Sequence, residues 1–460
     1  MTSAVINKFS NLAEAVHKGE SANGRLSWIE LAVETDAQLC DVLRKANEEK
    51  SWVFRGRTDE RVEKTAAFCT GRNGTPGGTA SDSTALFLDL SRLASITEHI
   101  REDQVISVQT GISLGKLAEH LAHHGQWLPL EFSRHDLLLA DVIDTGDGGF
   151  LETCFGGVKQ LVLGMHLSLM NGTSIKTGGK IVKNVTGYDL AKVFVGSRSW
   201  LAIPHMVHLR LYSKPETTAA MLVPGQRPQD LISLAAHLIS TGLPIHCLEC
   251  FDTRLAHKNE EVAQLSEGFN CALVISTKGQ NLVVREVSSS IQRKVEESGF
   301  EVRHLFNDRD GSAERLCSDL VDNSKRPTLE LNLPPSAMIY FFQTWWMQNG
   351  KPPWHARVGS GRLRLDSDGV DQRSSLETFA NLLQKDGFES FAFAHSSPRY
   401  EFQVSRLPNL SSVSALDGVM SRLKRQFDPL GCLNPLVRFT TDCPIADDSI
   451  SSTEQEPSKT

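Results

Sequence analysis

The segment Thr177-Gly-Gly-Lys-Ile-Val-Lys-Asn-Val-Thr-Gly-Tyr-Asp-Leu-Ala-Lys-Val-Phe-Val-Gly-Ser197 is the most distinctive part of the sequence. Its glycines allow the backbone to approach a ligand closely. Between positions 183 and 189 the chain supplies a cation, an amide, a phenol and an acid, from Lys183, Asn184, Tyr188 and Asp189. The segment predicts a strand and a turn that lead into a short helix over 189–195. A tight turn before a solvated helix start is the alternative to a ligand site.

The residues before this segment predict alternating strands and helices. A helix over 35–46 has a Thr35-x-x-Gln38 capping box and an apolar face. A second helix is expected from Ser113 to a stop at Gly125. Strands are predicted at 31–33, 52–54, 86–90 and 105–108. This order predicts a first half that is rich in βαβ units.

The second half follows a stretch rich in Pro, Thr and charged residues, 214–228, which is typical of a domain boundary. Beyond it, helices are predicted over 229–240, 376–384 and 416–427, and strands over 245–251 and 271–277. This mixture indicates an α+β unit. Residues 1–25 and 439–460 are polar and weakly patterned, which predicts loose tails.

Composition excludes several classes of protein. The 460 residues contain 48 Lys and Arg against 55 Asp and Glu, a formal charge of −7, so no broad nucleic-acid footprint is expected. The longest apolar stretch, 161–170, is too short to span a bilayer. The nine cysteines are sparse and odd in number, as in a reducing compartment, and no secretory signal is recognisable at the start. We therefore expect a cytoplasmic protein.

Three motifs carry a resemblance to a known family. They are Gly-Gly-Lys-Ile-Val-Lys-Asn-Val-Thr-Gly-Tyr-Asp-Leu-Ala-Lys at 178–192, Phe-Asp-Pro-Leu-Gly-Cys-Leu-Asn-Pro at 427–435, and Leu-Pro-Leu at 128–130 after a helix that ends in Gly125-Gln. Together they resemble the FAD-binding subunit of glycolate oxidase. That subunit belongs to the vanillyl-alcohol oxidase and p-cresol methylhydroxylase (PCMH) group of flavoproteins. The similarity extends from about residue 28 to 438.

The resemblance implies an α+β fold class in which a two-piece α/β FAD-binding domain of the PCMH type, residues 26–215, precedes an α+β cap domain, residues 216–438. It also implies a noncovalent FAD and the oxidation of a 2-hydroxy acid such as glycolate. A second flavin subunit and an iron–sulfur subunit are the implied partners. Any membrane association would then occur through a partner.

The first departure from the family pattern follows the strand at 52–54. The resembling proteins continue at once with a Gly-Gly-Gly-Thr-like loop, whose backbone N–H groups bind the FAD diphosphate. Here the chain continues Arg55-Gly-Arg-Thr-Asp-Glu, and a glycine-rich stretch comes later, at 71–79. That stretch is either a lengthened diphosphate loop or a surface turn.

The second departure concerns the other diphosphate stretch, where the family has a Gly-Gly pair and a Tyr-Gly pair. We align these with Ala140-Asp141 and Phe155-Gly156. If Asp141 faced a phosphate at about 4 Å, repulsion would cost about 4 kcal/mol at an effective dielectric constant of about 20. Either Asp141 points away, or FAD binds weakly or not at all. The glycine-rich stretch Thr145-Gly-Asp-Gly-Gly149 just downstream is able to bring the backbone close to the diphosphate instead, which keeps FAD binding open.

The third departure is Gly196-Ser-Arg-Ser-Trp-Leu-Ala202, where the family has Gly-Ser-x-Gly-Thr-Leu-Gly. Ser199 and Ala202 replace glycines, and we expect Trp200 to fill core space rather than to stack on an adenine. The resemblance and the glycine-rich loops together give the candidate FAD-binding residues Gly71, Gly74, Gly77, Gly78, Thr79, Thr145, Gly146, Gly149, Gly156, Lys183, Asn184, Gly187, Tyr188, Asp189 and Asn434.

The C-terminal half offers less chemistry. His355 has no second ligand at a metal-binding spacing, so no metal site is predicted. Arg357 or Arg362 is able to hold a substrate carboxylate, although exposed arginines are the simpler interpretation. Cys247 and Cys250 lie three apart in a predicted strand and so face opposite sides, which argues against an iron–sulfur site in this chain.

No residue is identified as a catalytic base. Two functions therefore stay open: a flavin-dependent oxidoreductase subunit for a 2-hydroxy acid, and a degenerate homologue that acts as an assembly or scaffold subunit.

Overall fold

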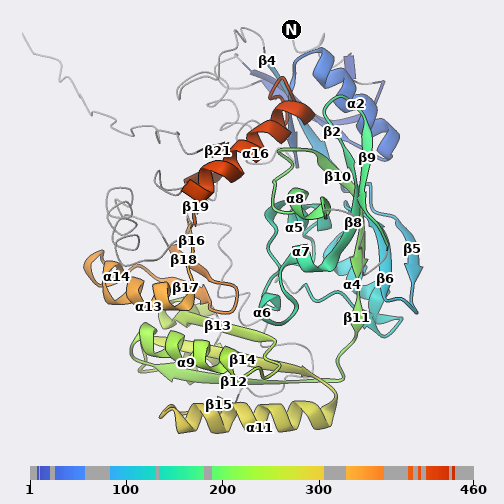
Figure 1. Cartoon of the computed structure of the whole chain (residues 1–460). Helices are drawn as coiled ribbons and strands as arrows, with labels where there is room; N and C mark the ends of the chain where they lie inside the picture. Colours follow the sequence, from blue (N-terminus) through green and yellow to red (C-terminus); the bar gives the residue numbers. More distant parts are fainter. Residues whose placement is uncertain are drawn as a thin grey trace, which may run out of the picture.

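The N-terminal sheet has four strands in the order β1-β2-β4-β3. Figure 1 labels β2 and β4 of this sheet near the N-terminus. The computed structural model describes residues 8–9, 11–20, 26–56, 83–130, 134–180, 189–258, 260–304, 328–366, 392–396, 402–405, 411–434 and 438–440. The strands are β1 (Glu14–Glu20), β2 (Leu26–Ala32), β3 (Trp52–Arg55) and β4 (Ser83–Asp89). The strands β2, β4 and β3 are parallel, as expected of βαβ units, and β1 is antiparallel to β2.

Helix α2 (Asp36–Glu48) begins at the predicted capping box. The Thr35 hydroxyl accepts a hydrogen bond from the Gln38 amide at 3.1 Å, and the Gln38 side chain accepts one from the Thr35 amide at 3.2 Å. The predicted apolar face of the helix is buried in the core of this first sheet. Local sequence therefore accounts for both the start of this helix and its orientation.

The expectation of a loose tail over residues 1–25 is wrong for β1. This strand pairs with β2 along its length, and Phe9 just before it is fully buried. Most residues of β1 are exposed or half-buried because it is an edge strand. It therefore lacks the apolar alternation from which a strand is recognised in a sequence.

A second, antiparallel sheet has the order β5-β6-β10-β8-β9. Its strands are β5 (Ile96–Ile100), β6 (Val105–Gln109), β8 (Val162–Ser168), β9 (Ser174–Gly178) and β10 (Ile203–Arg210). The helices of this region are α4 (Leu114–Ala122), α5 (Leu139–Thr145), α6 (Glu152–Phe155), α7 (Val158–Leu161) and α8 (Ala191–Phe194), and the short strands β7 (Gln126–Trp127) and β11 (Tyr212–Ser213) pair with each other. Trp200 is buried among the apolar residues of this sheet, as predicted.

The C-terminal sheet has ten strands in the order β15-β12-β14-β13-β17-β18-β16-β19-β20-β21. They are β12 (Thr217–Gly225), β13 (Cys247–Asp252), β14 (Cys271–Gly279), β15 (Arg303–His304), β16 (Thr328–Asn332), β17 (Trp354–Arg357), β18 (Arg362–Asp366), β19 (Ala392–Ser396), β20 (Phe402–Ser405) and β21 (Arg438–Thr440). The helices are α9 (Pro228–Ser240), η1 (Thr253–Lys258), α10 (Glu260–Leu265), α11 (Asn281–Glu297), α13 (Pro335–Gln343), α14 (Trp345–Gln348) and α16 (Ser411–Phe427). Residues 217–225, which were expected within a boundary segment, form β12.

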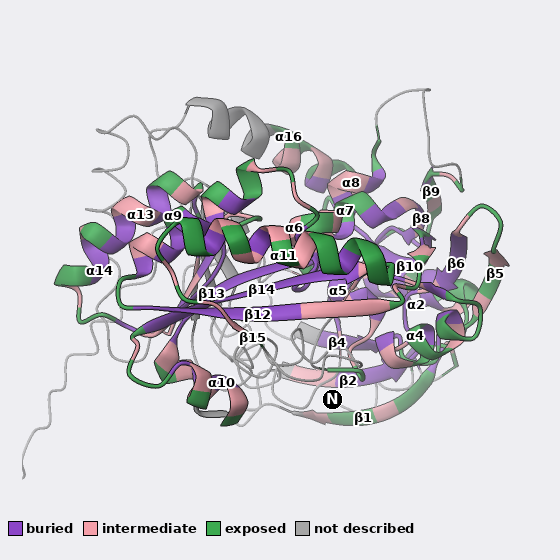
Figure 2. Ribbon diagram, turned by 90° about the horizontal axis from the view of Figure 1, so that it is seen from below, coloured by how far each residue is buried: buried purple, intermediate pink, exposed green. Residues whose placement is uncertain are grey.

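Strands β12, β13 and β14 lie between α9 and α11 on one side and α10 on the other (Figure 2). Because neighbouring residues of β13 face opposite sides, Cys250 packs with the α9 and α11 side and Cys247 with the α10 side. The expectation of opposite faces for these two cysteines is confirmed. The helix predicted over 376–384 lies outside the described residues.

Helix α16 and the residues that follow it up to Asn434 pack against the N-terminal unit, before β21 returns to the C-terminal sheet. Helix α16 directs Met420, Leu423 and Phe427 toward the core of the five-stranded sheet. Beyond it, the Val53 amide donates to the Cys432 carbonyl at 2.9 Å, beside strand β3. The prediction that residues 216–438 form one cap domain is therefore wrong for α16, because the apolar face of this helix is buried against the N-terminal unit.

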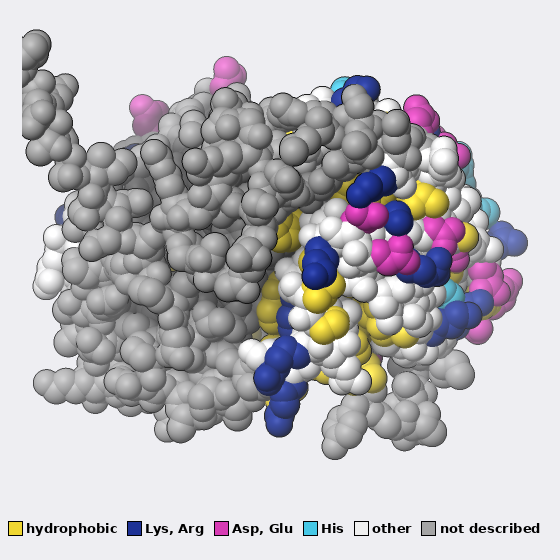
Figure 3. Space-filling view, turned by 90° about the horizontal axis from the view of Figure 1, so that it is seen from above, with side chains coloured by type: hydrophobic (Ala, Val, Ile, Leu, Met, Phe, Trp, Pro, Cys, Tyr) yellow, Lys and Arg dark blue, Asp and Glu magenta, His cyan; other side chains and the backbone are white. Residues whose placement is uncertain are grey.

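The surface seen from above mixes both signs of charge. In its described part, Lys and Arg side chains are interspersed with Asp and Glu side chains and with hydrophobic patches (Figure 3). The described part of this face is therefore mixed in character rather than uniformly basic. Among the described helices, none has the length and apolar character needed to cross a membrane.

Candidate functional site

Three arginines of the C-terminal sheet converge on one carboxylate of the N-terminal unit. Arg357 ends β17 and pairs across the hairpin with Arg362 of β18, while Arg364 lies two residues further on the same face. Arg357 donates to Asp147 Oδ1, and Arg364 Nη2 lies 2.9 Å from Asp147 Oδ2. Arg362 Nη1 is 3.7 Å from Asp147 Oδ1. We call these three residues the arginine cluster; they join the sheet to the loop after α5.

Three glutamates complete the surroundings of the arginine cluster. Glu330 of β16 accepts from Arg364 Nε at 2.9 Å, and Glu152 of α6 lies 3.5 Å from Arg362 and 3.6 Å from Arg357. Glu249 of β13 lies 3.7 Å from Arg357 Nε. The charges of the arginines are thus largely compensated within the chain.

Burial and charge set the protonation states of this site. Burial alone would raise the pKa of Asp147, but Arg357, Arg364 and Arg362 outweigh it and hold that pKa well below its usual range. Desolvation instead raises the pKa of Glu249 well above normal and lowers the pKa of His355 well below normal. The two groups lie 2.6 Å apart, a separation that requires a proton between them, so we describe them as a neutral carboxyl and a neutral imidazole.

Two expectations about this region need correction. Arg357 is not an exposed arginine, because only 3% of its surface is accessible. His355 does have an acidic neighbour, the carboxyl group of Glu249, which the pairing of β13 with β17 brings beside it. The separation of the two residues in the sequence hid this contact. Asp147 itself was missed as a functional residue, and the only signal was one acid among the glycines of 145–149.

The glycine-rich loop 145–149 mainly ends helix α5 and presents Asp147. Gly146 has φ 67° and caps α5, and Gly156 has φ 73° and follows the last residue of α6. The Thr145 hydroxyl donates to the Asp141 carbonyl at 3.0 Å, and the Gly149 amide donates to Asp147 Oδ1 at 3.0 Å. These four candidate residues therefore lie together, and the described contacts use them within the chain.

The three departures from the family's glycine pattern meet in a second ionic group, which we call the Arg55 network. Arg55 donates to Asp144, and its Nη1 lies 2.8 Å from Asp141 Oδ1. The Ser199 hydroxyl lies 2.9 Å and 2.8 Å from the two Asp144 carboxylate oxygens. Arg55, Asp144 and Ser199 are all buried. Each of the three positions that depart from the family pattern thus carries a side chain with a partner in the network. Arg55 pairs with Asp141, and Ser199 pairs with Asp144 of the same helix, α5.

Asp141 does not carry an unpaired charge. Besides its contact with Arg55, its Oδ2 accepts from the Leu138 amide at 3.1 Å, at the start of α5. Of the two alternatives left open for this residue, the structure supports the one in which the carboxylate is turned to a partner within the chain.

The backbone around Ala140-Asp141 does not fit an FAD diphosphate. The amides of Leu139, Ala140 and Asp141 donate to the carbonyls of Ile112, Thr110 and Leu138 at 2.9, 2.7 and 2.9 Å. With the Leu138 amide held by Asp141, all four N–H groups from 138 to 141 are engaged. A diphosphate nest needs such groups to be available.

The predicted residue Asn434 is brought to the Arg55 network from the other end of the chain. Its side-chain amide lies 2.5 Å from the Arg198 carbonyl, and its backbone amide donates to the Val53 carbonyl at 2.8 Å. Arg198 and Ser199 both have φ 55°, a conformation that favours glycine. The strained turn is thus fixed by Asp144 on one side and by Asn434 on the other.

Asp189 is the one remaining candidate among the described residues, and its described ion pair is not with either group. Asp189 is exposed and lies 3.5 Å from Lys192 Nζ at the start of α8. The other candidates lie outside the described residues: Gly71, Gly74, Gly77, Gly78, Thr79, Lys183, Asn184, Gly187 and Tyr188.

Comparison with known proteins identifies one domain of the chain. Residues 30–178 match the family model of the FAD binding domain. A D-lactate dehydrogenase of Anaerostipes hadrus is 22% identical over 334 residues, which cover 72% of this chain and 64% of that protein. The glycolate oxidase subunit GlcD of Bacillus subtilis is 31% identical over 177 residues, 38% of each chain. The chain thus spans less than two thirds of the length of these two relatives.

Solved structures identify the fold. The structure of p-cresol methylhydroxylase with substrate bound superposes with a TM-score of 0.62 over 93% of this chain and 95% of that one, at 14% sequence identity. At that identity the likeness shows the fold alone. It confirms the predicted α+β class with a PCMH-type FAD-binding fold.

Proposed function

We propose that this chain, which carries an FAD-binding domain of the PCMH type, is a subunit of an oxidoreductase that oxidises a 2-hydroxy acid. The relatives named D-lactate dehydrogenase and glycolate oxidase subunit support this substrate class. In the proposal, glycolate is one candidate substrate, FAD is held noncovalently, and a second flavin subunit and an iron–sulfur subunit are the partners.

The arginine cluster is the observation that carries the proposal. A 2-hydroxy acid is an anion, and guanidinium groups bind carboxylates through two parallel hydrogen bonds. Bound FAD would supply the acceptor for a hydride from the substrate. The chain's own residues would bind and orient the acid, and the diphosphate contacts would come from Gly71–Thr79 and from Lys183–Asp189.

Arg362 is the arginine that we assign to the substrate carboxylate. Arg357 and Arg364 have close contacts to Asp147, whereas the nearest described contacts of Arg362 are 3.4 to 3.7 Å long. Its side chain is 17% exposed, against 4% for Arg357. Arg362 can therefore turn toward an anion and break weaker contacts than Arg357 or Arg364 would break.

The Arg362→Ala variant is expected to lower kcat/KM for glycolate or D-lactate about 100-fold, because a charge-assisted paired contact contributes about 3 kcal/mol. Arg362→Lys should be intermediate, since it keeps the charge and loses the planar fork. The matched control is Arg227→Ala, which removes an arginine with a 68% exposed side chain from the start of α9. Equal rates in all four proteins would contradict the assignment.

A second candidate function is an assembly or scaffold subunit without flavin chemistry of its own. The Arg55 network favours it, because the network engages the segments in which the resemblance implies diphosphate contacts. The partners would be the same flavin and iron–sulfur subunits.

The flavin content of the purified chain separates the two functions. The flavoprotein subunit should release about one FAD per chain on denaturation, with the flavin absorption in the supernatant after the protein is precipitated. In addition, millimolar FAD should raise the Tm of flavin-depleted protein, since a ligand bound at 100 times its Kd stabilises by about 2.7 kcal/mol. A flavin-free chain whose Tm ignores FAD would exclude the first function and leave the second.

The proposed location is the cytoplasm, with any membrane contact made by a partner. Its support is that all the cysteines in the described part of the chain are free thiols, as expected in a reducing compartment.

A further inference from the structure

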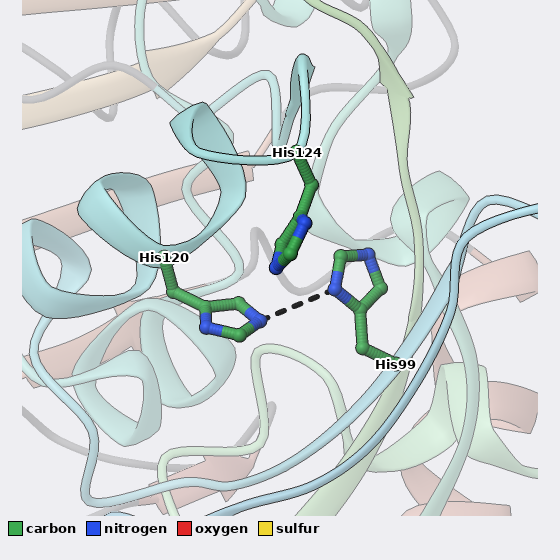
Figure 4. Close-up of side chains that lie close together, drawn as sticks. All are labelled: His99, His120 and His124. Carbon is green, nitrogen blue, oxygen red and sulfur yellow. Dashed lines mark hydrogen bonds between the residues drawn. The ribbon is translucent and has the colours of Figure 1, made fainter.

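Three histidines gather at the outer edge of the five-stranded sheet, in what we call the histidine cluster. His99 lies on the edge strand β5, His120 lies in the last turn of α4, and His124 lies in the turn that follows that helix (Figure 4). The spacing of His120 and His124, four residues apart, places both on one side of the chain. The cluster belongs to elements other than those that carry the arginine cluster.

The three rings point toward a common centre (Figure 4). Their centroids form a nearly equilateral triangle with sides of 5.2, 5.1 and 5.1 Å. One ring nitrogen of each lies within 4.8 Å of the others, and His99 Nδ1 is 3.2 Å from His120 Nε2. Nitrogen ligands of tetrahedral zinc, at about 2.05 Å from the ion, are about 3.3 Å apart. The closest pair of nitrogens thus already has the separation that a shared ion requires.

A buried amide orients His99 for this role. His99 Nε2 lies 2.8 Å from Gln126 Oε1, while the Gln126 side-chain nitrogen donates to the Arg101 carbonyl at 2.8 Å. Because that second bond fixes the amide nitrogen on Arg101, the amide oxygen must face His99 and accept its Nε2 proton. The Nδ1 lone pair is then directed to the centre of the cluster. Metal-binding histidines are commonly held in this way by a carbonyl on the second ring nitrogen.

The electrostatic surroundings favour neutral imidazoles. Desolvation, followed by the neighbouring histidines, lowers the pKa of His120, and desolvation together with Arg101 lowers the pKa of His124. A metal ion binds the neutral form of imidazole, so a lowered pKa reduces competition from protons at these two rings. The positive charge of Arg101 disfavours a bound metal ion as well as a bound proton. The affinity for the metal must therefore come from the three imidazole ligands.

We propose that His99, His120 and His124 bind one zinc ion, with the fourth position taken by water. Three imidazoles with an open position form a known type of zinc coordination, and imidazole ligands also suit copper and nickel. The ion would join the end of α4 to the edge strand β5. The alternative is a hydrogen bond from His120 to His99 beside an unrelated His124, which requires neither the regular triangle nor the third ring.

Titration of the untagged full chain with zinc tests the proposal. After dialysis against a chelator, the protein should bind one zinc ion per chain by calorimetry. Cobalt(II) as a probe should give the intense visible bands of a tetrahedral site, and zinc should abolish them. His99→Ala, His120→Ala and His124→Ala should each weaken binding at least about 100-fold, and Gln126→Ala should weaken it about 10- to 100-fold.

The matched control is His237→Ala, which removes an exposed histidine from the last turn of another amphipathic helix, α9. This variant should bind zinc as the parent chain does. Circular dichroism verifies that each variant is folded. The proposal is overturned if the parent chain gives no tetrahedral cobalt spectrum, or if folded His124→Ala binds zinc as tightly as His237→Ala.

Discussion

The Asp147→Asn variant is expected to lose about 3 to 5 kcal/mol of unfolding free energy, because it removes the nearest negative charge from the buried Arg357 and one of the two close carboxylates from the half-buried Arg364. The amide keeps the shape of the carboxylate, so the loss reports on charge rather than on packing. Chemical denaturation at pH 7, followed by fluorescence and circular dichroism, measures the midpoint and the slope. The midpoint should fall while the slope stays constant.

The control for this variant is Asp136→Asn. Asp136 also pairs with an arginine, Arg134, at 2.8 Å, but its side chain is 71% exposed. Exposed ion pairs contribute at most about 1 kcal/mol, so this variant should differ little from the parent. If Asp147→Asn were no more destabilised than Asp136→Asn, the arginine cluster would not hold the two units together.

The loss of unfolding free energy in Asp147→Asn should depend on pH. Since the pKa of Asp147 is lowered in the folded chain, its contribution to stability is complete above the ordinary Asp pKa of about 3.9. That contribution is lost as the pH falls toward the lower folded value. The difference in stability between the parent and Asp147→Asn should therefore be largest near neutral pH and shrink below about pH 4.

The Arg55→Met variant should be destabilised by a similar amount, about 3 to 5 kcal/mol, since Asp144 would remain buried without its cation. Adding Asp144→Leu should restore part of the loss, because the two buried charges are then removed together. Thermal denaturation of the parent, both single variants and the double variant completes the cycle.

For comparison, Arg227→Met removes an arginine from a pair with Asp230 whose side chains are 68% and 35% exposed. It should leave the Tm almost unchanged. Additive losses in Arg55→Met and Asp144→Leu would contradict a coupled network. Such a result would also remove the argument for the second candidate function. That argument requires that the residues standing at the family's glycine positions interact energetically with one another.

Local patterns were sufficient to predict much of the fold. The capping box at Thr35 defines the start of α2, and the apolar spacing of α4 and α9 places their buried faces correctly. These signals act between residues at most a few positions apart. They failed at β1, whose exposed edge has little apolar patterning, and at α16, whose apolar face does not reveal which unit it covers.

The candidate site was only partly predictable. The glycines at 146 and 156 were recognised as special, but their contacts within the chain were not. The sequence identifies Asp141 as an obstacle to a diphosphate. The cation that compensates the charge of Asp141 is Arg55, which lies 86 residues away in the sequence. Nothing in either local sequence indicates that the two would meet.

The sequence by itself determined helix starts and buried faces, because these depend on side-chain periodicity and on capping within one turn. The class of fold followed from the motifs that resemble a known family. Only the tertiary structure decided the charge chemistry. Asp147 meets Arg357 and Arg364 across 210 and 217 residues, and His99 meets His120 across 21. The energy of such groups depends on distance and burial in the folded chain, so an acid or a histidine acquires its role only when folding brings its partners to it.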